Sequence, residues 1–188
     1  MRSPDPPSYI GARGHIWQMP WGSEGDPGGV LVAGVGYTFL HDLSFGPEIV
    51  RRLQEMAWPA GVEVTDLSQS PIAVYQQLSE RRYDKVILVG AVRRDRAAAT
   101  IHCYRPDGPL PAEEEIQARI GEGVSGTVSL DSTVIVCRYF GALPADTLVV
   151  EVEPEDESWG EGFSPKVAAA VDEVIELVRR EALAAVEA

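Results

Sequence analysis

The sequence offers few side chains that could perform acid–base or metal chemistry. Only three histidines occur in 188 residues, and one of them, His41, adjoins Asp42 shortly after an apolar run from Gly29 to Gly34. A neighbouring imidazole and carboxylate could share a proton or a metal ion. The alternative interpretation is that Asp42 and Ser44 only cap the helix that follows them.

A second candidate is Asp66, which closes the alternating segment Val62 to Thr65. An aspartate at the end of a strand could bind a ligand, but a turn would use the same residue type. The two cysteines, Cys103 and Cys137, show neither a disulfide framework nor the spacing of a zinc site, and we interpret both as small buried apolar residues.

The segment from Gly34 to Phe39 lies where nucleotide-binding motifs occur, yet it fits none of them. A dinucleotide fingerprint needs a third glycine where Phe39 stands, and a P-loop needs a Gly-Lys-Ser/Thr ending. A nucleophile elbow, Gly-x-Ser-x-Gly between strand and helix, does not occur either. The sequence therefore gives no support to nucleotide binding or to serine-triad hydrolysis.

Elements that could position these residues alternate between strand and helix. Strands are expected at 29–34, 62–65, 85–92, 100–104 and 148–152, and helices after Ser44, after Ser70, at 113–120 and after Ser164. Residues 130–140 fit either a strand or a helix, and 121–129 is typical of a mobile loop. The alternation predicts an α/β fold whose mostly parallel sheet has helices on both faces and binds ligands beyond the carboxyl ends of its strands.

Composition narrows the function further. Apolar residues make up 45% of the chain and charged residues 24%, with a net charge of −13, which disfavours nucleic acids and anionic membranes as partners. No apolar stretch is long enough to span a membrane, and no signal peptide is recognised, so we expect a cytoplasmic protein. We expect a Pro/Gly-rich, partly disordered extension over 1–28 and one domain over 29–188.

Several short segments, in their order and spacing, resemble the hydrogenase maturation endopeptidases. They are Gly34-Val35-Gly36 with Asp42 and Gly46, then Val62 to Asp66, Tyr83 to Val89, Arg138 to Pro144, Glu153 to Glu155, and Gly162 to Pro165. The resemblance implies a three-layer α/β/α sandwich with a mixed five-stranded sheet. It also implies cleavage of a C-terminal peptide from the large subunit of nickel–iron hydrogenase, with nickel bound by two acidic residues and a histidine.

At the positions implied by the resemblance, most of the nickel ligands are replaced. Asp66 matches one ligand, but Leu43 stands at the acidic position of the first loop and the later histidine falls near Gly126. Tyr37 replaces an asparagine and Gly90 an aspartate. One carboxylate is too few to hold a borderline divalent ion, so nickel is expected only if the site is rebuilt, with His41 and Asp42 as speculative ligands beside Asp66.

Several interpretations therefore remain open. The chain could be a divergent maturation protease, or a catalytically silent module that binds or escorts a hydrogenase subunit or another protein tail. Its partner-binding residues would then include Tyr37, Phe39, Leu43 and Gly126. A small-molecule site lined by Tyr37, Phe39 and the segment 121–129 is a third possibility, and an unrelated α/β binding domain a fourth. The sequence identifies no catalytic residue, so whether the chain is an enzyme stays open.

Overall fold

The computed structural model describes residues 28–187, so the expected extension over 1–28 lies, but for its last residue, outside the described part of the chain. The strands are β1 (Gly29–Gly34), β2 (Val62–Asp66), β3 (Tyr83–Ala91), β4 (Ile101–Tyr104) and β5 (Asp146–Val152). The helices are α1 (Phe45–Gln54), α2 (Pro71–Ser79), α3 (Glu113–Val124), α4 (Leu130–Tyr139) and α5 (Pro165–Val186), with a 3₁₀ turn, η1 (His41–Ser44), before α1.

The strands form one mixed sheet in the order β2-β1-β3-β5-β4. The first four strands in this order run parallel to their neighbours, and β4 pairs antiparallel with β5 at the edge. The chain moves outward to one side from β1 to β2 and to the other side from β3 to β5. The carboxyl ends of β1 and β3 therefore flank the point at which the strand order reverses, where open α/β sheets bind ligands.

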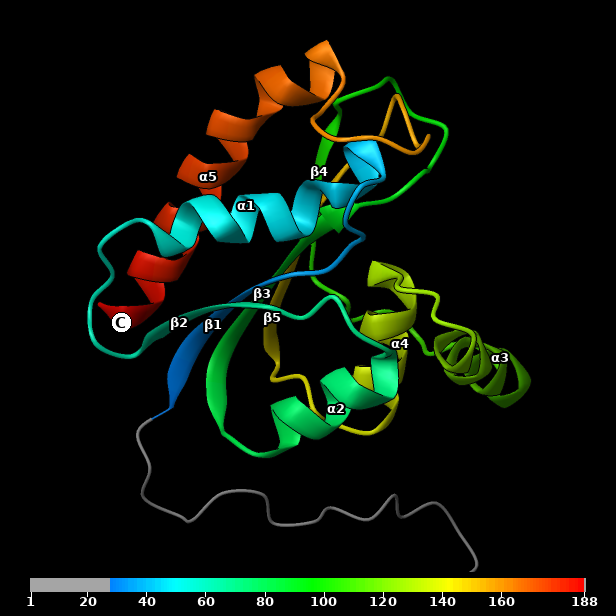
Figure 1. Cartoon of the computed structure of the whole chain (residues 1–188). Helices are drawn as coiled ribbons and strands as arrows, with labels where there is room; N and C mark the ends of the chain where they lie inside the picture. Colours follow the sequence, from blue (N-terminus) through cyan, green and yellow to red (C-terminus); the bar gives the residue numbers. More distant parts are fainter. Residues whose placement is uncertain (1–27, 188) are drawn as a thin grey trace, which may run out of the picture.

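Helices cover both faces of the sheet, which confirms the expected α/β/α sandwich. Figure 1 shows α1 and α5 on one face and α2 and α4 on the other, with α3 outside α2 and α4. Alternate residues of each central strand feed two separate cores, as in Val30 and Leu31 of β1. None of the helices within 28–187 is long and apolar enough to cross a membrane.

Glycine lets α1 approach the sheet closely. A Cβ atom on Gly46, in the first turn of α1, would lie 2.5 Å from the carbonyl oxygen of Val35 and 2.6 Å from that of Val89. A Cβ on Gly34 would meet the carbonyl oxygen of Gly46 at 2.2 Å. The spacing of these glycines therefore sets how near the start of α1 sits to the ends of β1 and β3.

The structure resolves residues 130–140 as a helix, α4, although Thr133, Val134, Ile135 and Val136 favour a strand by propensity. Burial decides the outcome, because six of the ten residues of α4 are buried and the hydroxyl of Ser129 accepts a hydrogen bond from the Ser132 amide at its start. Helix α3 extends to Val124, so the predicted mobile loop over 121–129 shortens to a few residues.

Two serines stand at N-cap positions as expected but do not cap through their side chains. Ser44 precedes α1, and its hydroxyl accepts a hydrogen bond from the Leu40 amide at 3.2 Å. Ser164 precedes α5, and its hydroxyl donates to Asp42 at 2.8 Å. Ser70, before α2, does cap through its side chain, by accepting from the Ala73 amide.

Candidate functional site

A cavity of about 230 Å³ opens at the reversal of strand order. Three segments that are distant in sequence form its wall: the loop after β1, the end of β3 with the loop that follows, and the approach to α4. The lining residues are Val35, Gly36, Tyr37, Leu43, Ala91, Val92, Arg93, Thr127, Val128, Ser129, Leu130 and Glu157. Most of this lining is apolar, so the cavity suits an apolar or neutral group with charge at one side.

The polar groups of the cavity are few and largely paired. The Tyr37 hydroxyl accepts a hydrogen bond from the Val128 amide at 3.0 Å, which ties the first loop to the approach to α4. Arg93 donates to Glu157, and both side chains are partly exposed. The cavity therefore holds one cation and one anion that face each other, and a ligand group of either charge could exchange with one of them.

Asp42 lies beside this cavity rather than in its lining, and its role is structural. It is fully buried. Its carboxylate accepts four hydrogen bonds of 2.8 to 2.9 Å, from the amides of Glu155, Asp156 and Ser164 and from the Ser164 hydroxyl. A buried charge requires such compensation. Asp42 therefore fixes the loop between β5 and α5 against η1.

The His41 ring contacts the same loop through other residues than Asp42 does. Its Nδ1 lies 3.1 Å from the carbonyl oxygen of Gly162, and its Nε2 lies 3.9 Å from a carboxylate oxygen of Asp156. The imidazole also covers Gly160, where a Cβ would lie 2.2 Å from Nε2. His41 and Asp42 thus help to hold one loop, but their functional groups do not meet.

Asp66 is exposed at the end of β2, outside the cavity lining. Its Oδ1 accepts a hydrogen bond from the Ser68 amide at 2.9 Å, which is the turn that the sequence offered as the alternative. Ser68 in turn accepts from the Gly36 amide at 3.2 Å. Asp66 therefore stabilises the turn at Ser68, and the Ser68 hydroxyl contacts the loop after β1.

The other residues expected at the site divide in a similar way. Tyr37 and Leu43 line the cavity, whereas Phe39 points into solvent and stacks on Trp159. Gly126 precedes the lining residue Thr127 and adopts a φ of +84°. The structure thus brings Tyr37 and Leu43 together in the cavity wall. The other candidates, His41, Asp42, Phe39, Asp66 and Gly126, lie outside the lining.

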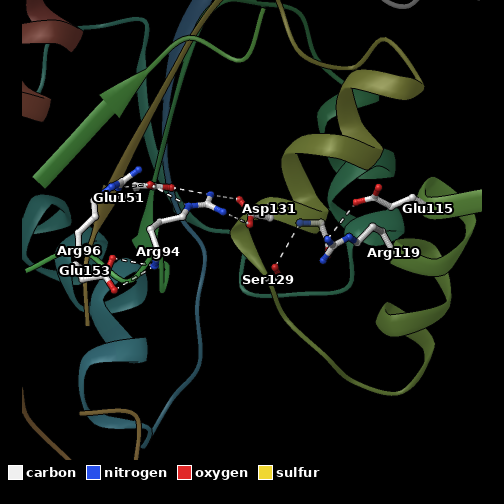
Figure 2. Close-up of polar contacts among 9 residues, drawn as sticks. Arg94, Arg96, Glu115, Arg119, Ser129, Asp131, Glu151 and Glu153 are labelled. Carbon is white, nitrogen blue, oxygen red and sulfur yellow. Dashed lines mark hydrogen bonds and ion pairs between the residues drawn. The ribbon is translucent and has the colours of Figure 1, made fainter. Parts of the chain in front are cut away.

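An ionic cluster next to the cavity was missed by the sequence reasoning. Glu151 at the end of β5 is 1% exposed and accepts hydrogen bonds from both Arg94 and Arg96. Figure 2 shows Arg94 reaching between Glu151 and Asp131 of α4, while Glu153 accepts from the Arg94 amide. The sequence did carry a signal for this cluster, because Glu151 stands among apolar residues in the predicted strand 148–152 and a buried acid needs a cationic partner.

The cluster sets the charge state of its members. Burial alone would raise the pKa of Glu151, but the hydrogen bonds from Arg94 and Arg96 outweigh it and hold this pKa below its ordinary value. The same pairing raises the pKa of Arg94. Glu151 is thus an ionised structural carboxylate. Elsewhere in the fold, burial raises the pKa of the Cys137 thiol to about 12, which leaves this thiol unreactive.

Known proteins share both sequence and fold with this chain. A candidate hydrogenase maturation protease of Methanocaldococcus jannaschii is 27% identical over 150 residues, which cover 79% of this chain and 93% of that protein. An endopeptidase from Escherichia coli superposes with a TM-score of 0.61 at 26% identity, over 80% of this chain and 89% of the other. The chain is therefore similar in sequence to a hydrogenase maturation protease and in fold to an endopeptidase.

The hydrogenase-maturating endopeptidase HybD of Escherichia coli has the same fold, with a TM-score of 0.60 and 24% identity over 80% of this chain and 89% of the other. No protein-family model matches the chain. The fold therefore agrees with that of a hydrogenase-maturating endopeptidase.

In this chain, the residues at the nickel positions that the resemblance implies do not fit the ion. Leu43 presents hydrocarbon to the cavity, Gly126 has no side chain, and Asp66 already turns toward the Ser68 amide. A side chain at Gly90 would place its Cβ 2.7 Å from the carbonyl oxygen of Val35. Nickel affinity comes from several nitrogen and oxygen donors at fixed geometry.

The rebuilt site that the sequence suggested meets a second obstacle. Asp42 would have to release amide and hydroxyl donors that are buried with it before it could bind a cation. Within residues 28–187, no three His, Cys, Asp or Glu side chains are grouped so that they could hold a metal ion.

Proposed function

We propose that this protein acts on the large subunit of a nickel–iron hydrogenase during its maturation, by engaging the C-terminal segment of that subunit at the cavity beside Tyr37 and Leu43. The observation that carries the proposal is the cavity itself, at the reversal of strand order in a maturation-protease fold. The mostly apolar lining of the cavity suits an apolar side chain of the peptide. The Arg93–Glu157 pair offers one cation and one anion to the peptide groups that flank this side chain.

We further propose that the protein does this without a nickel ion held by its own side chains. The donor set supports this view, since hydrocarbon and glycine stand at two of the three implied ligand positions. The chain then engages its partner through the apolar wall and the charged pair. This proposal predicts that added nickel leaves the thermal midpoint of the isolated protein unchanged, because only a bound ligand stabilises the folded state.

The decisive experiment mixes the full chain with a hydrogenase large-subunit precursor, with and without added nickel, and weighs the products by mass spectrometry. We expect a shortened subunit, and we expect Leu43→Arg, which places a long charged side chain in the cavity, to prevent the shortening. An intact subunit that stays bound to the chain would contradict cleavage and favour an escort protein. An intact subunit that does not bind would contradict the proposed function altogether.

Val186→Ser provides the matched control, since Val186 is an exposed apolar residue at the far end of α5. We expect this variant to process the subunit at the rate of the unmodified protein. Equal losses in Leu43→Arg and Val186→Ser would remove the cavity from the proposal.

A further inference from the structure

Two large aromatic side chains are exposed beside the cavity. Phe39 is 50% and Trp159 78% exposed, although the remaining large apolar side chains of residues 28–187 are buried or half-buried apart from Leu110 and Val186. The two rings stack with centroids 6.3 Å apart and planes inclined by 29°. Together they form an apolar surface that the described fold leaves uncovered, and such surfaces mark binding sites in stable proteins.

The backbone holds this aromatic pair in place. The Gly160 amide donates to the Phe39 carbonyl at 2.9 Å, and the His41 amide donates to the Gly160 carbonyl at 3.0 Å. Phe39 adopts a φ of +63°, which is unfavourable for a bulky residue and persists only where the surroundings enforce it. The buried carboxylate of Asp42 links η1 to the loop between β5 and α5, so the aromatic pair lies on a rigid support.

Rigidity of this kind favours binding. A side chain that is already ordered loses little conformational entropy when a partner covers it. Tryptophan is also among the residues that contribute most to protein interfaces. Figure 1 shows the orange segment between β5 and α5 beside the start of α1.

The charges around the pair indicate what could cover it. Asp156, Glu157 and Glu161 belong to the same loop as Trp159, and the whole chain carries a net charge of −13. Among the described residues, Arg93 pairs with Glu157 and Lys166 with Glu155. Within this part of the chain, Glu161 has no such pair, and Asp156 has only the His41 imidazole 3.9 Å away. Carboxylates beside aromatic faces attract guanidinium and ammonium groups and repel acidic segments.

We propose that Phe39 and Trp159 form a docking surface for a segment of the partner protein that carries Arg or Lys next to an apolar side chain. This inference rests on the proposed function, because the surface continues into the cavity: Tyr37 and Glu157 line the cavity, and each lies two residues from one ring of the pair. The bound segment therefore runs from the aromatic pair to the cavity. Residues 1–27 of this chain carry two Arg against three acids, so they lack the charge that the surface selects.

The test measures the binding of short fluorescein-labelled peptides to the full chain by fluorescence anisotropy. One peptide carries Arg beside Leu and the other has Glu in place of each Arg. We expect the basic peptide to bind roughly 10-fold or more tightly than the acidic one, and to lose affinity as salt is added. Equal binding of the two peptides would overturn the proposal.

Variants locate the binding. Trp159→Ser should weaken the basic peptide about 10-fold, and Phe39→Gly should weaken it as well while relieving the positive φ, so that lost binding is not mistaken for unfolding. Leu110→Ser, at an exposed apolar residue elsewhere, is the control and should bind normally. If Leu110→Ser weakens binding as much as Trp159→Ser, the proposal is wrong. It is also wrong if the double variant Trp17→Ser/Trp21→Ser binds the peptide 10-fold more tightly, because the chain's own leading segment would then have occupied the surface.

The precursor assay separates this inference from the function on which it rests. Trp159→Ser should raise the precursor concentration needed for half-maximal processing and leave the maximal rate unchanged. If the full chain binds the basic peptide but never processes or binds the precursor, the proposed function fails and the surface stands. If Trp159→Ser processes the precursor with unaltered concentration dependence, the docking surface fails and the proposed function stands.

Discussion

At the scale of single residues, Asp42 shows how one carboxylate can be misread from sequence. Its neighbour His41 suggested shared acid–base or metal chemistry, yet the carboxylate is buried and accepts four hydrogen bonds from the loop that precedes α5. The bonds link residues more than 100 positions apart. Asp42 therefore fixes the position of the loop that carries Glu157 and Trp159.

Asp42→Asn tests this role directly. Asparagine keeps one acceptor oxygen, but its NH2 group would face donors at the other oxygen position and could not accept from them. We therefore expect the free energy of unfolding to fall by about 3 kcal/mol. Urea unfolding followed by tryptophan fluorescence measures the change. The matched control is Asp66→Asn, where an exposed asparagine can form the same turn and should change stability by less than about 0.5 kcal/mol. Similar losses in the two variants would show that Asp42 is not a structural anchor.

At the scale of elements, the cluster around Arg94 connects three parts of the site. It joins the loop after β3 to Glu151 of β5 and to Asp131 in the first turn of α4 (Figure 2). The segment just before Arg94 and the segment just before Asp131 both line the cavity. The ion pairs therefore hold the loop after β3 and the start of α4, which form two walls of the cavity, at a fixed separation. Leu43 and the other apolar lining residues have no polar side-chain groups that could do this.

Arg94→Met should lower the free energy of unfolding by about 2 kcal/mol at neutral pH, since Glu151 stays buried with Arg96 as its remaining partner. Arg93→Met, which breaks an exposed pair with Glu157, should cost less than about 0.5 kcal/mol. Urea titrations of both variants measure the difference. An effect of Arg94→Met no larger than that of Arg93→Met would show that the cluster adds nothing to stability.

The pH dependence of the Arg94 variant follows from the lowered pKa of Glu151. A carboxylate with a lowered pKa stabilises the folded state above its unfolded pKa, near 4.5, and loses this contribution as the pH falls through the folded value. The stability difference between Arg94→Met and the unmodified protein should therefore be full at neutral pH and shrink below about pH 4.5. A difference that grows on acidification would contradict this assignment.

At the scale of the whole molecule, charge is unbalanced. The chain has 29 acidic and 16 basic residues, and their mutual repulsion opposes the compact state. The same imbalance supports a basic partner segment in the proposal above. Most ion pairs within residues 28–187 lie at the surface, where they contribute little, so repulsion is expected to dominate the response to salt.

We therefore expect the thermal midpoint to rise by a few degrees when sodium chloride is increased from about 20 to about 200 mM, because salt screens repulsion between exposed charges. Differential scanning calorimetry at neutral pH gives the sign. Sodium sulfate at equal ionic strength is a poor substitute, since sulfate also strengthens apolar burial. A midpoint that falls with sodium chloride would show that attractive pairs outweigh the net charge.

The sequence by itself predicted most of the elements and the fold class. The apolar β-branched runs at 29–34 and 85–92 predict strands buried on both faces, and Ser164-Pro165 followed by a helical apolar repeat predicts α5, because these patterns depend on neighbours along the chain. The glycines at 34, 36 and 46 contributed to the family resemblance, and each of them lies where two backbone segments nearly touch.

Tertiary structure alone decided what the polar residues do. Residues 130–140 became a helix because burial against α2 and the sheet outweighed strand propensity, and Asp42 became an anchor because its partners come from a loop far along the chain. The pairing of Glu151 with Arg94 and the stacking of Phe39 on Trp159 likewise join distant segments. Pattern along one chain predicts which face is buried, whereas the partner of each charge or ring depends on which segments the fold brings together.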